Sequence, residues 1–199
     1  MDMLFPEETR QNDLMKIVDS VLGKEKAVIF ISDFILKEDD EKKHSDISCN
    51  LKLKNETIAI KGKGDGPVDA LFKGLVKKLN KKYISLCNVK FDDFSLKVKF
   101  KESFRWSKTD APVEIKLVLV NEKNKRMYFH ARSRSLIVAA ITAIRKALEY
   151  LINCELSVIQ LRKDIKDADK RGRDDLTEKY THQLAALIDT GNDYKKLFK

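Results

Sequence analysis

The sequence predicts an α+β fold of two pseudo-repeated ββ(β)α units packed as sheet-plus-helix layers, with an N-terminal helical segment and a C-terminal helical extension. Apolar residues alternate with polar ones over 47–60 and again over 112–131, which is the period of half-buried strands. Each alternating region is followed by apolar residues at helical spacing, over 68–79 and 135–152. Shifting the chain by 69 residues places the first helical pattern on the second, which indicates an internal repeat.

The first 45 residues are expected to form a separate helical and linker segment. Helical spacing predicts a helix over Gln11–Leu22, with Gly23 as its stop. The apolar stretch Ala27–Leu36 fits either a strand or a buried turn of helix. The charge cluster Lys37–Ser45 is typical of an exposed linker, so the first domain boundary is placed there.

Residues 46–154 are predicted to form the repeat domain itself. A hairpin over 47–60 leads into the first helix, and further strands are expected at 85–91 and 94–100 before a hairpin over 112–131. The serines of the turn before the second helix, Ser133 and Ser135, fall on the glycines of the first turn at the same offset of 69 residues.

Residues 155–199 are predicted to be a C-terminal helical extension. Two apolar stripes at helical spacing flank Gly172. They fit a helical hairpin, or a long continuation of the second repeat helix followed by one more helix. Such stripes need a partner surface in the same chain or in another one.

Charge is concentrated in the central segment. Residues 46–154 carry 23 basic and 11 acidic residues, whereas residues 1–45 carry 7 basic and 11 acidic ones. A positive field of this kind attracts nucleic acid, an acidic protein surface or carboxylate ligands, although lysines on a solvent face would give the same count.

The remaining composition argues against metals, disulfides and membranes. The three cysteines are widely spaced and form no CxxC pair, and the three histidines lie far apart in the chain. The acidic N-terminal stretch has no apolar core, so it is no signal peptide, and no apolar run is long enough to span a bilayer. We therefore expect a cytoplasmic protein that uses no cofactor and no metal and contacts no membrane.

The segment GKGDGPVDALFKGL, residues 62–75, is the most informative motif. It predicts a strand, a glycine turn and the first turn of a helix, with Pro67 in that first turn. Glycines let a ligand approach the backbone, and the N–H groups at a helix start favour a carboxylate or phosphate. The spacing matches neither a Walker loop nor a dinucleotide fingerprint, and a tight turn without any ligand explains it equally well.

The run Gly64-Asp65-Gly66-Pro67-Val68-Asp69-Ala70, after a hairpin and before an amphipathic helix, resembles the C-terminal regulatory domain of 2-isopropylmalate synthases and citramalate synthases. The resemblance covers about residues 46–152. It implies paired βββα units that dimerise and bind a branched-chain amino acid, leucine or isoleucine, as a feedback effector at the dimer interface. The implied effector-binding residues lie in the two helix-start turns: Gly62, Gly64, Asp65, Gly66, Pro67, Val68, Ala70, Ser133, Ser135 and Ile137. Among them, Val68 and Ala70 would line the pocket, and Asp65 would order the turn or cap the helix.

The chain departs from that family in two ways. Leu136 stands near the place where the family has an aspartate at the start of the second helix, so the amino group of an effector loses a natural partner. The catalytic barrel of the acyltransferase is also absent from this chain, so we expect no enzyme activity here. A separate catalytic synthase subunit is the implied partner.

Two other functions remain open from the residues. A basic βββα unit could bind double-stranded RNA, but Asp69 lies where such domains carry a lysine cluster, which makes nucleic acid an unlikely partner. A purely structural oligomerisation module that uses the helical tail is the other alternative.

Overall fold

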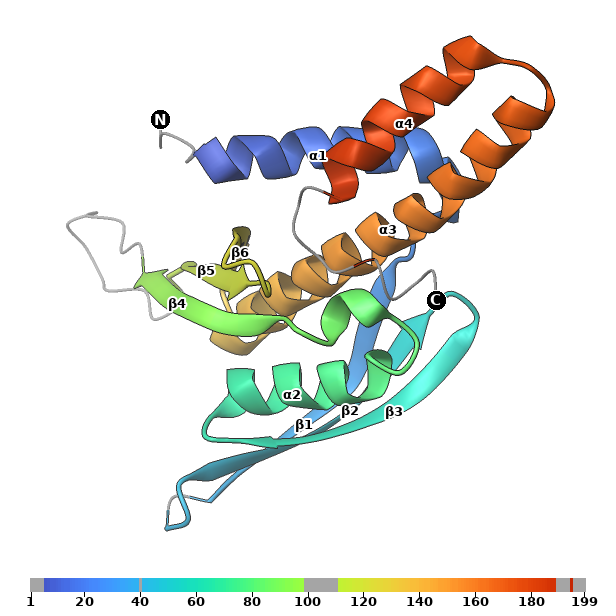
Figure 1. Ribbon diagram of the computed structural model, residues 1–199. Coiled ribbons are helices and arrows are strands. Elements are labelled where there is room, and N and C mark those ends of the chain that lie inside the picture. Colours follow the sequence, from blue (N-terminus) through green and yellow to red (C-terminus); the bar gives the residue numbers. More distant parts are fainter. Residues whose placement is uncertain (1–5, 40, 99–110, 189–193, 195–199) are drawn as a thin grey trace.

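The computed structural model describes residues 6–39, 41–98, 111–188 and 194 (Figure 1). These residues form two three-stranded antiparallel sheets and four α-helices. This confirms the α+β class and the predicted helices at the N-terminal and C-terminal ends of the chain. In chain order the elements are α1 (Pro6–Leu22), the 3-10 turn η1 (Gly23–Glu25), β1 (Ile29–Asp39), β2 (His44–Leu53), β3 (Glu56–Gly64), α2 (Pro67–Leu79), the 3-10 turn η2 (Ile84–Leu86), β4 (Lys90–Val98), β5 (Val113–Val120), β6 (Arg126–Ser133), α3 (Leu136–Lys170) and α4 (Asp174–Ile188).

The chain forms two βββα units in succession. Strands β1-β2-β3 make the first sheet and are followed by α2, and β4-β5-β6 make the second and are followed by α3. The starts of α2 and α3 are 69 residues apart, at Pro67 and Leu136. Alternation along β2 and β5 sends apolar side chains to the face that the helix covers, such as Leu51 and Leu117, which are fully buried. The internal repeat read from the sequence is therefore present in the fold.

The predicted linker over residues 37–45 is wrong. Strand β1 runs to Asp39 and pairs with β2 through Glu38 opposite Ser45 and Asp39 opposite His44, so a boundary at residue 45 would fall within β2. The charged residues lie near the solvent-exposed end of this hairpin, which explains why the segment looked like a linker. The apolar stretch Ala27–Leu36 therefore belongs mainly to a strand.

The strand predicted over residues 85–91 is also wrong in its first half. Residues 84–86 form η2, and the strand begins only at Lys90. The backbone N–H of Ser85 donates to Oε2 of Glu155 in α3 at 2.7 Å, so a helix side chain takes the place of a strand partner there. The predicted strand end at Phe100 lies outside the described residues.

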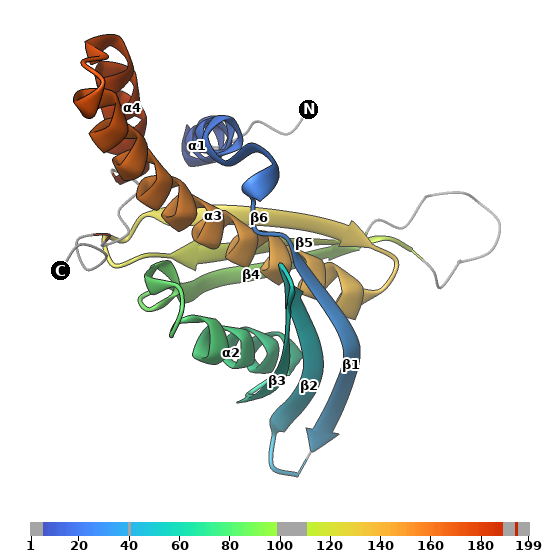
Figure 2. The same ribbon diagram turned by 90° about the vertical axis from the view of Figure 1, so that its right-hand side faces the viewer.

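Helix α3 is a single helix of 35 residues that continues well past the second sheet (Figure 2). A turn at Gly172, with φ of +63°, sends α4 back along the second half of α3, where Ala168 and Leu187 are fully buried. Of the two arrangements that fit the sequence, the structure has the long continuation of the second repeat helix, followed by one more helix. The apolar stripes of the tail thus find part of their partner surface in the same chain.

Two amide side chains fix the strands to the helices. Asn153 of α3 accepts from the N–H of Ala27 at 2.7 Å and donates to its carbonyl at 2.9 Å, just before β1. Gln11 of α1 makes the same pair of bonds with the N–H and carbonyl of Tyr128 on β6, at 2.9 and 3.0 Å. Because β6 is an edge strand, Gln11 satisfies backbone groups that would otherwise be open to another strand.

Candidate functional site

The glycine turn lies where β3 passes under α2, and its first two glycines are required by packing. A Cβ atom on Gly62 would lie 2.0 Å from the carbonyl oxygen of Ala70, and one on Gly64 would lie 2.5 Å from the Ala70 nitrogen. A Cβ atom on Gly74 of α2 would lie 2.9 Å from the Cα atom of Gly62. Only glycine allows the strand and the helix to approach so closely. Ala70 itself has no exposed surface, so in this structure it supports the turn from within.

Gly66 differs from these two glycines because it faces open space. It is the N-cap residue of α2 with φ of −167°, an extended backbone that any residue adopts. A Cβ atom there would meet nothing within 4 Å. Neither backbone geometry nor packing within the described residues calls for glycine here. The space beside Gly66 is thus available to a ligand or to a second subunit.

The first turn of α2 is organised by Asp69, which sequence reasoning gave no role in the site. Its carboxylate accepts from the backbone N–H of Asp65 at 3.2 Å and pairs with Lys73 at 2.6 Å. The hydrogen bond to Asp69 raises the pKa of Lys73. The capping expected of Asp65 therefore involves its backbone N–H and the side chain of Asp69. An acid at the third helical position can accept from a backbone N–H just before the helix, and this position is the sequence signal of the contact.

The start of α3 is capped by its own serines. The Oγ atom of Ser135 accepts from the N–H of Val138 at 3.4 Å, and the Oγ atom of Ser133 accepts from the N–H of Ser135 at 3.2 Å. Leu136 begins this helix with 44% of its surface exposed. The second helix start thus presents hydroxyl and apolar groups where the first presents a carboxylate.

The two helix starts lie on the same side of the molecule in Figure 1. Val68 and Ile137, which correspond in the repeat, are half-buried in the two first turns. Exposed apolar side chains surround the start of α3, and we call them the α3-start patch: Leu136 (44% exposed), Val138 (51%) and Val98 (39%). Val98 belongs to this end of the sheet because it pairs with Val113, which in turn pairs with Ser133.

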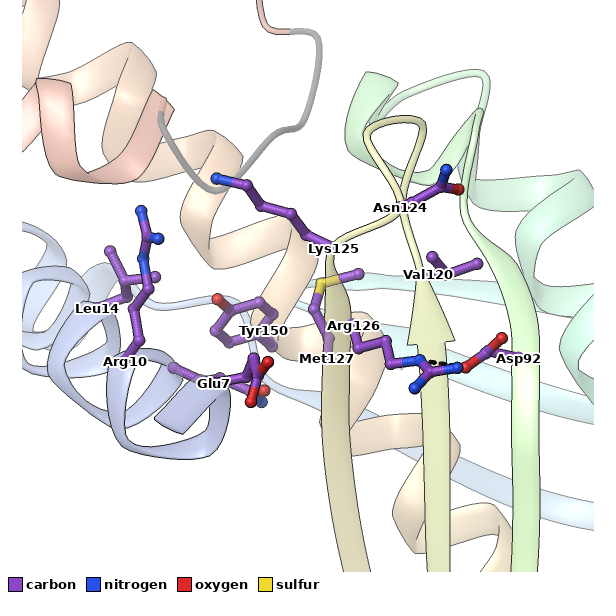
Figure 3. Close-up of a pocket in the computed structure, with 11 residues that line it drawn as sticks. Glu7, Arg10, Leu14, Asp92, Val120, Asn124, Lys125, Arg126, Met127 and Tyr150 are labelled. Carbon is purple, nitrogen blue, oxygen red and sulfur yellow. Dashed lines mark ion pairs between the residues drawn. The ribbon is translucent and has the colours of Figure 1, made fainter. Parts of the chain in front are cut away.

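A cavity of about 610 Å³ lies elsewhere, between α1, the β5–β6 turn and α3 (Figure 3). No local sequence pattern marks this cavity, because its walls come from α1, β4, the β5–β6 hairpin and α3, which are separated along the chain. Among the described residues its lining is mixed in character: Glu7, Arg10, Gln11, Leu14, Asp92, Val120, Asn124, Lys125, Arg126, Met127 and Tyr150.

Two βββα units, with both helix starts on one side beside exposed apolar side chains, define a repeated α+β module whose turns a ligand can reach. The model of the LeuA allosteric (dimerisation) domain family matches residues 8–152, and the chain belongs to this family. Its role is thus regulatory and dimerising, as the resemblance of the glycine turn implied. The match covers the allosteric domain and includes α1, which the sequence analysis had placed outside the repeat domain.

No curated protein matches the chain. Among the described residues, no helix is long and apolar enough to cross a membrane. The same part of the chain holds no group of three or more His, Cys, Asp or Glu side chains placed to bind a metal ion.

Proposed function

We propose that this regulatory, dimerising domain binds a branched-chain amino acid, leucine or isoleucine, as a feedback effector at the start of α2. The observation that carries the proposal is the open space at Gly66. Gly62 and Gly64 are explained by packing, whereas Gly66 has no backbone reason to be glycine and no packing reason among the residues that the structure describes. Room for a ligand supplies that reason.

The chemistry of the two helix starts suits a small zwitterion with an apolar side chain. The first backbone N–H groups of α2 have no partner within the helix and favour the effector carboxylate. Val68 and Ile137 offer partly exposed apolar surface for a branched side chain. Asp69 is already engaged by Asp65 and Lys73, so the exposed side chain of Asp65 is the acid that we assign to the effector ammonium group.

The turn residues would then divide their work between shape and contact. Gly62, Gly64 and Ala70 hold β3 and α2 together, while Gly66, Pro67 and Asp65 face the effector. Ser133 and Ser135 shape the second turn, beside the α3-start patch. A second copy of the chain that covers this patch would enclose the effector, because exposed apolar clusters of this kind mark association surfaces.

A domain of this kind acts on a synthase. We infer that the effector signal passes to a catalytic condensing subunit or domain of leucine biosynthesis, in the cytoplasm. The domain itself supplies no catalytic step in this proposal.

Thermal unfolding with leucine, isoleucine and valine tests the effector assignment. A ligand at 100 times its Kd adds about 2.7 kcal/mol, which raises the Tm by about 5–11 °C for a chain of this size. Gly66→Asp should abolish the response, because it places a carboxylate where the effector carboxylate binds. Thr57→Asp, which adds the same charge at an exposed position of β3, should keep it. No response to any of the three amino acids, or an unchanged response in Gly66→Asp, would refute the proposal.

One observation favours binding of a polyanion as a second candidate. A groove beside β3 and α2 is lined by a single acid, Asp46, and by five lysines. These lysines are Lys37, Lys61, Lys63, Lys73 and Lys77. Lys63 pairs with Asp46 at 3.2 Å and Lys73 with Asp69, which offsets part of this charge. Binding to duplex RNA that weakens steeply with salt and is lost in Lys61→Glu would favour this candidate.

A further inference from the structure

We propose that the groove beside β3 and α2, which Asp46 and the five lysines line, binds a small ligand that carries two or more phosphate groups. The proposal rests on the second candidate function and names the ligand class of that groove, and it does not depend on the effector site. The groove has a volume of about 670 Å³, which lies within the range of about 300–1,000 Å³ typical of small-molecule sites.

Two glycines bring lysines of a strand and of a helix to the same groove. A Cβ atom on Gly74 of α2 would lie 2.9 Å from the Cα atom of Gly62 in β3, so the two backbones are in contact there. Lys61 and Lys63 flank Gly62 on the strand, and Lys73 precedes Gly74 on the helix. The close approach of β3 to α2 therefore gathers ammonium groups from two elements along one groove.

The exposed face of the first sheet continues the groove. Lys37 of β1, Asp46 of β2 and Lys63 of β3 form one row across the three strands, because Asp46 is paired with both lysines in the strand register. Ile35 and Lys61 lie in the next row on the same face, and Ile35 is 55% exposed. The groove thus combines several ammonium groups with an exposed apolar side chain.

Three of the five lysines have a charge that the described residues leave uncompensated. Lys63 and Lys73 are paired with acids, as noted above. In the part of the chain that the structure describes, Lys37, Lys61 and Lys77 make no ion pair. A ligand with several negative charges compensates these three ammonium groups, whereas a single phosphate group carries only about two charges.

Acidic residues border the groove on two sides, which favours a short ligand. Asp39 follows Lys37 by two positions on the same face of β1. Asp65 follows Lys63 by two positions, at the start of α2, and is exposed. A nucleic acid that ran beyond the groove would bring further phosphates toward these carboxylates, which weakens binding by like-charge repulsion. The charge pattern therefore favours a short oligophosphate over duplex RNA.

Calorimetric titration of the full chain with tripolyphosphate and with orthophosphate tests the site. Tripolyphosphate should bind once per chain and at least about 10-fold more tightly than orthophosphate, because only the longer anion reaches several ammonium groups. Lys61→Gln and Lys77→Gln should each weaken tripolyphosphate by about 3-fold, and the double variant should weaken it by about 10-fold. Lys78→Gln, which removes the neighbouring exposed charge of α2 outside the groove, is the matched control and should bind normally.

Equal affinity for the two anions, no binding of tripolyphosphate at millimolar concentration, or equal losses in Lys78→Gln and Lys77→Gln would overturn the assignment. Duplex RNA that binds the wild type and not the double variant, while tripolyphosphate fails to bind, would also overturn it and would leave the second candidate function standing. The Tm response to leucine or isoleucine should persist in the double variant, so failure at this groove and failure at the effector site give different results.

Discussion

Replacing Gly62 by alanine would force apart β3 and α2 at their closest point. The added Cβ atom would lie 2.0 Å from the carbonyl oxygen of Ala70, whereas ordinary contacts begin near 3.4 Å. Strand and helix would have to separate by about 1.4 Å, and both contacting groups are backbone, so no side chain can rotate away.

The expected cost follows from this geometry. Overpacking typically costs about 1–3 kcal/mol, and a rigid backbone contact belongs at the upper end of that range. The alanine also stiffens the unfolded chain, which returns about 0.4–1 kcal/mol. We expect a net loss of about 2 kcal/mol, or a Tm lower by about 4–8 °C.

Gly66→Ala is the matched comparison, because its Cβ atom meets nothing within 4 Å and its φ of −167° suits any residue. Its free energy of unfolding should match the wild type or rise by up to about 1 kcal/mol. Urea denaturation of both variants without ligand measures the difference. If Gly62→Ala were as stable as the wild type, the close approach of β3 to α2 would be wrong; if Gly66→Ala unfolded as easily as Gly62→Ala, the space at Gly66 would not be open.

Three further predictions follow, two on the amide side chains that fix the strands to the helices and one on the cysteines. Gln11→Ala should cost about 1–3 kcal/mol in urea denaturation, because it leaves the N–H and carbonyl of Tyr128 without their partner. Asn153→Ala should cost at least as much, because Asn153 is buried and its two bonds hold the start of the first sheet on α3. In the native protein at pH 8 a thiol reagent should modify exposed Cys87 quickly and leave Cys154 unmodified, because burial raises the pKa of Cys154 to about 12.

The buried thiol of Cys154 also makes the free energy of unfolding depend on pH. Because the pKa of Cys154 is higher in the folded state than its usual 9.0, its contribution to stability is complete below about pH 9 and is lost as the pH rises toward 12. Cys154→Ala should therefore unfold with a flatter pH profile than the wild type above pH 9.

Rapid modification of Cys154 in the native state, or an Asn153→Ala variant as stable as the wild type, would contradict the packing described for α3. For the edge of β6, the exposed neighbour Asn12→Ala is the control and should be neutral.

Local patterns were enough to predict most elements of the repeat. The alternation in β2 and β5 and the helical spacing in α2 and α3 identified strands and helices correctly, because one face of each element is buried against the other layer. The patterns failed at the charged end of the β1–β2 hairpin and at Ser85. At the hairpin end the strand structure comes from pairing between β1 and β2, which the hydrophobic pattern does not record. At Ser85 it is the distant Glu155 that accepts from the backbone N–H in place of a strand partner.

The amino-acid sequence by itself determined the repeated α+β fold and drew attention to the glycine turn, because periodicity and glycine content are local properties. Only the tertiary structure decided which glycine is needed for packing and which faces open space, since that depends on how near α2 lies to β3. It also created the cavity at Tyr150, because residues of α1, β4, the β5–β6 hairpin and α3 become neighbours only when the layers pack.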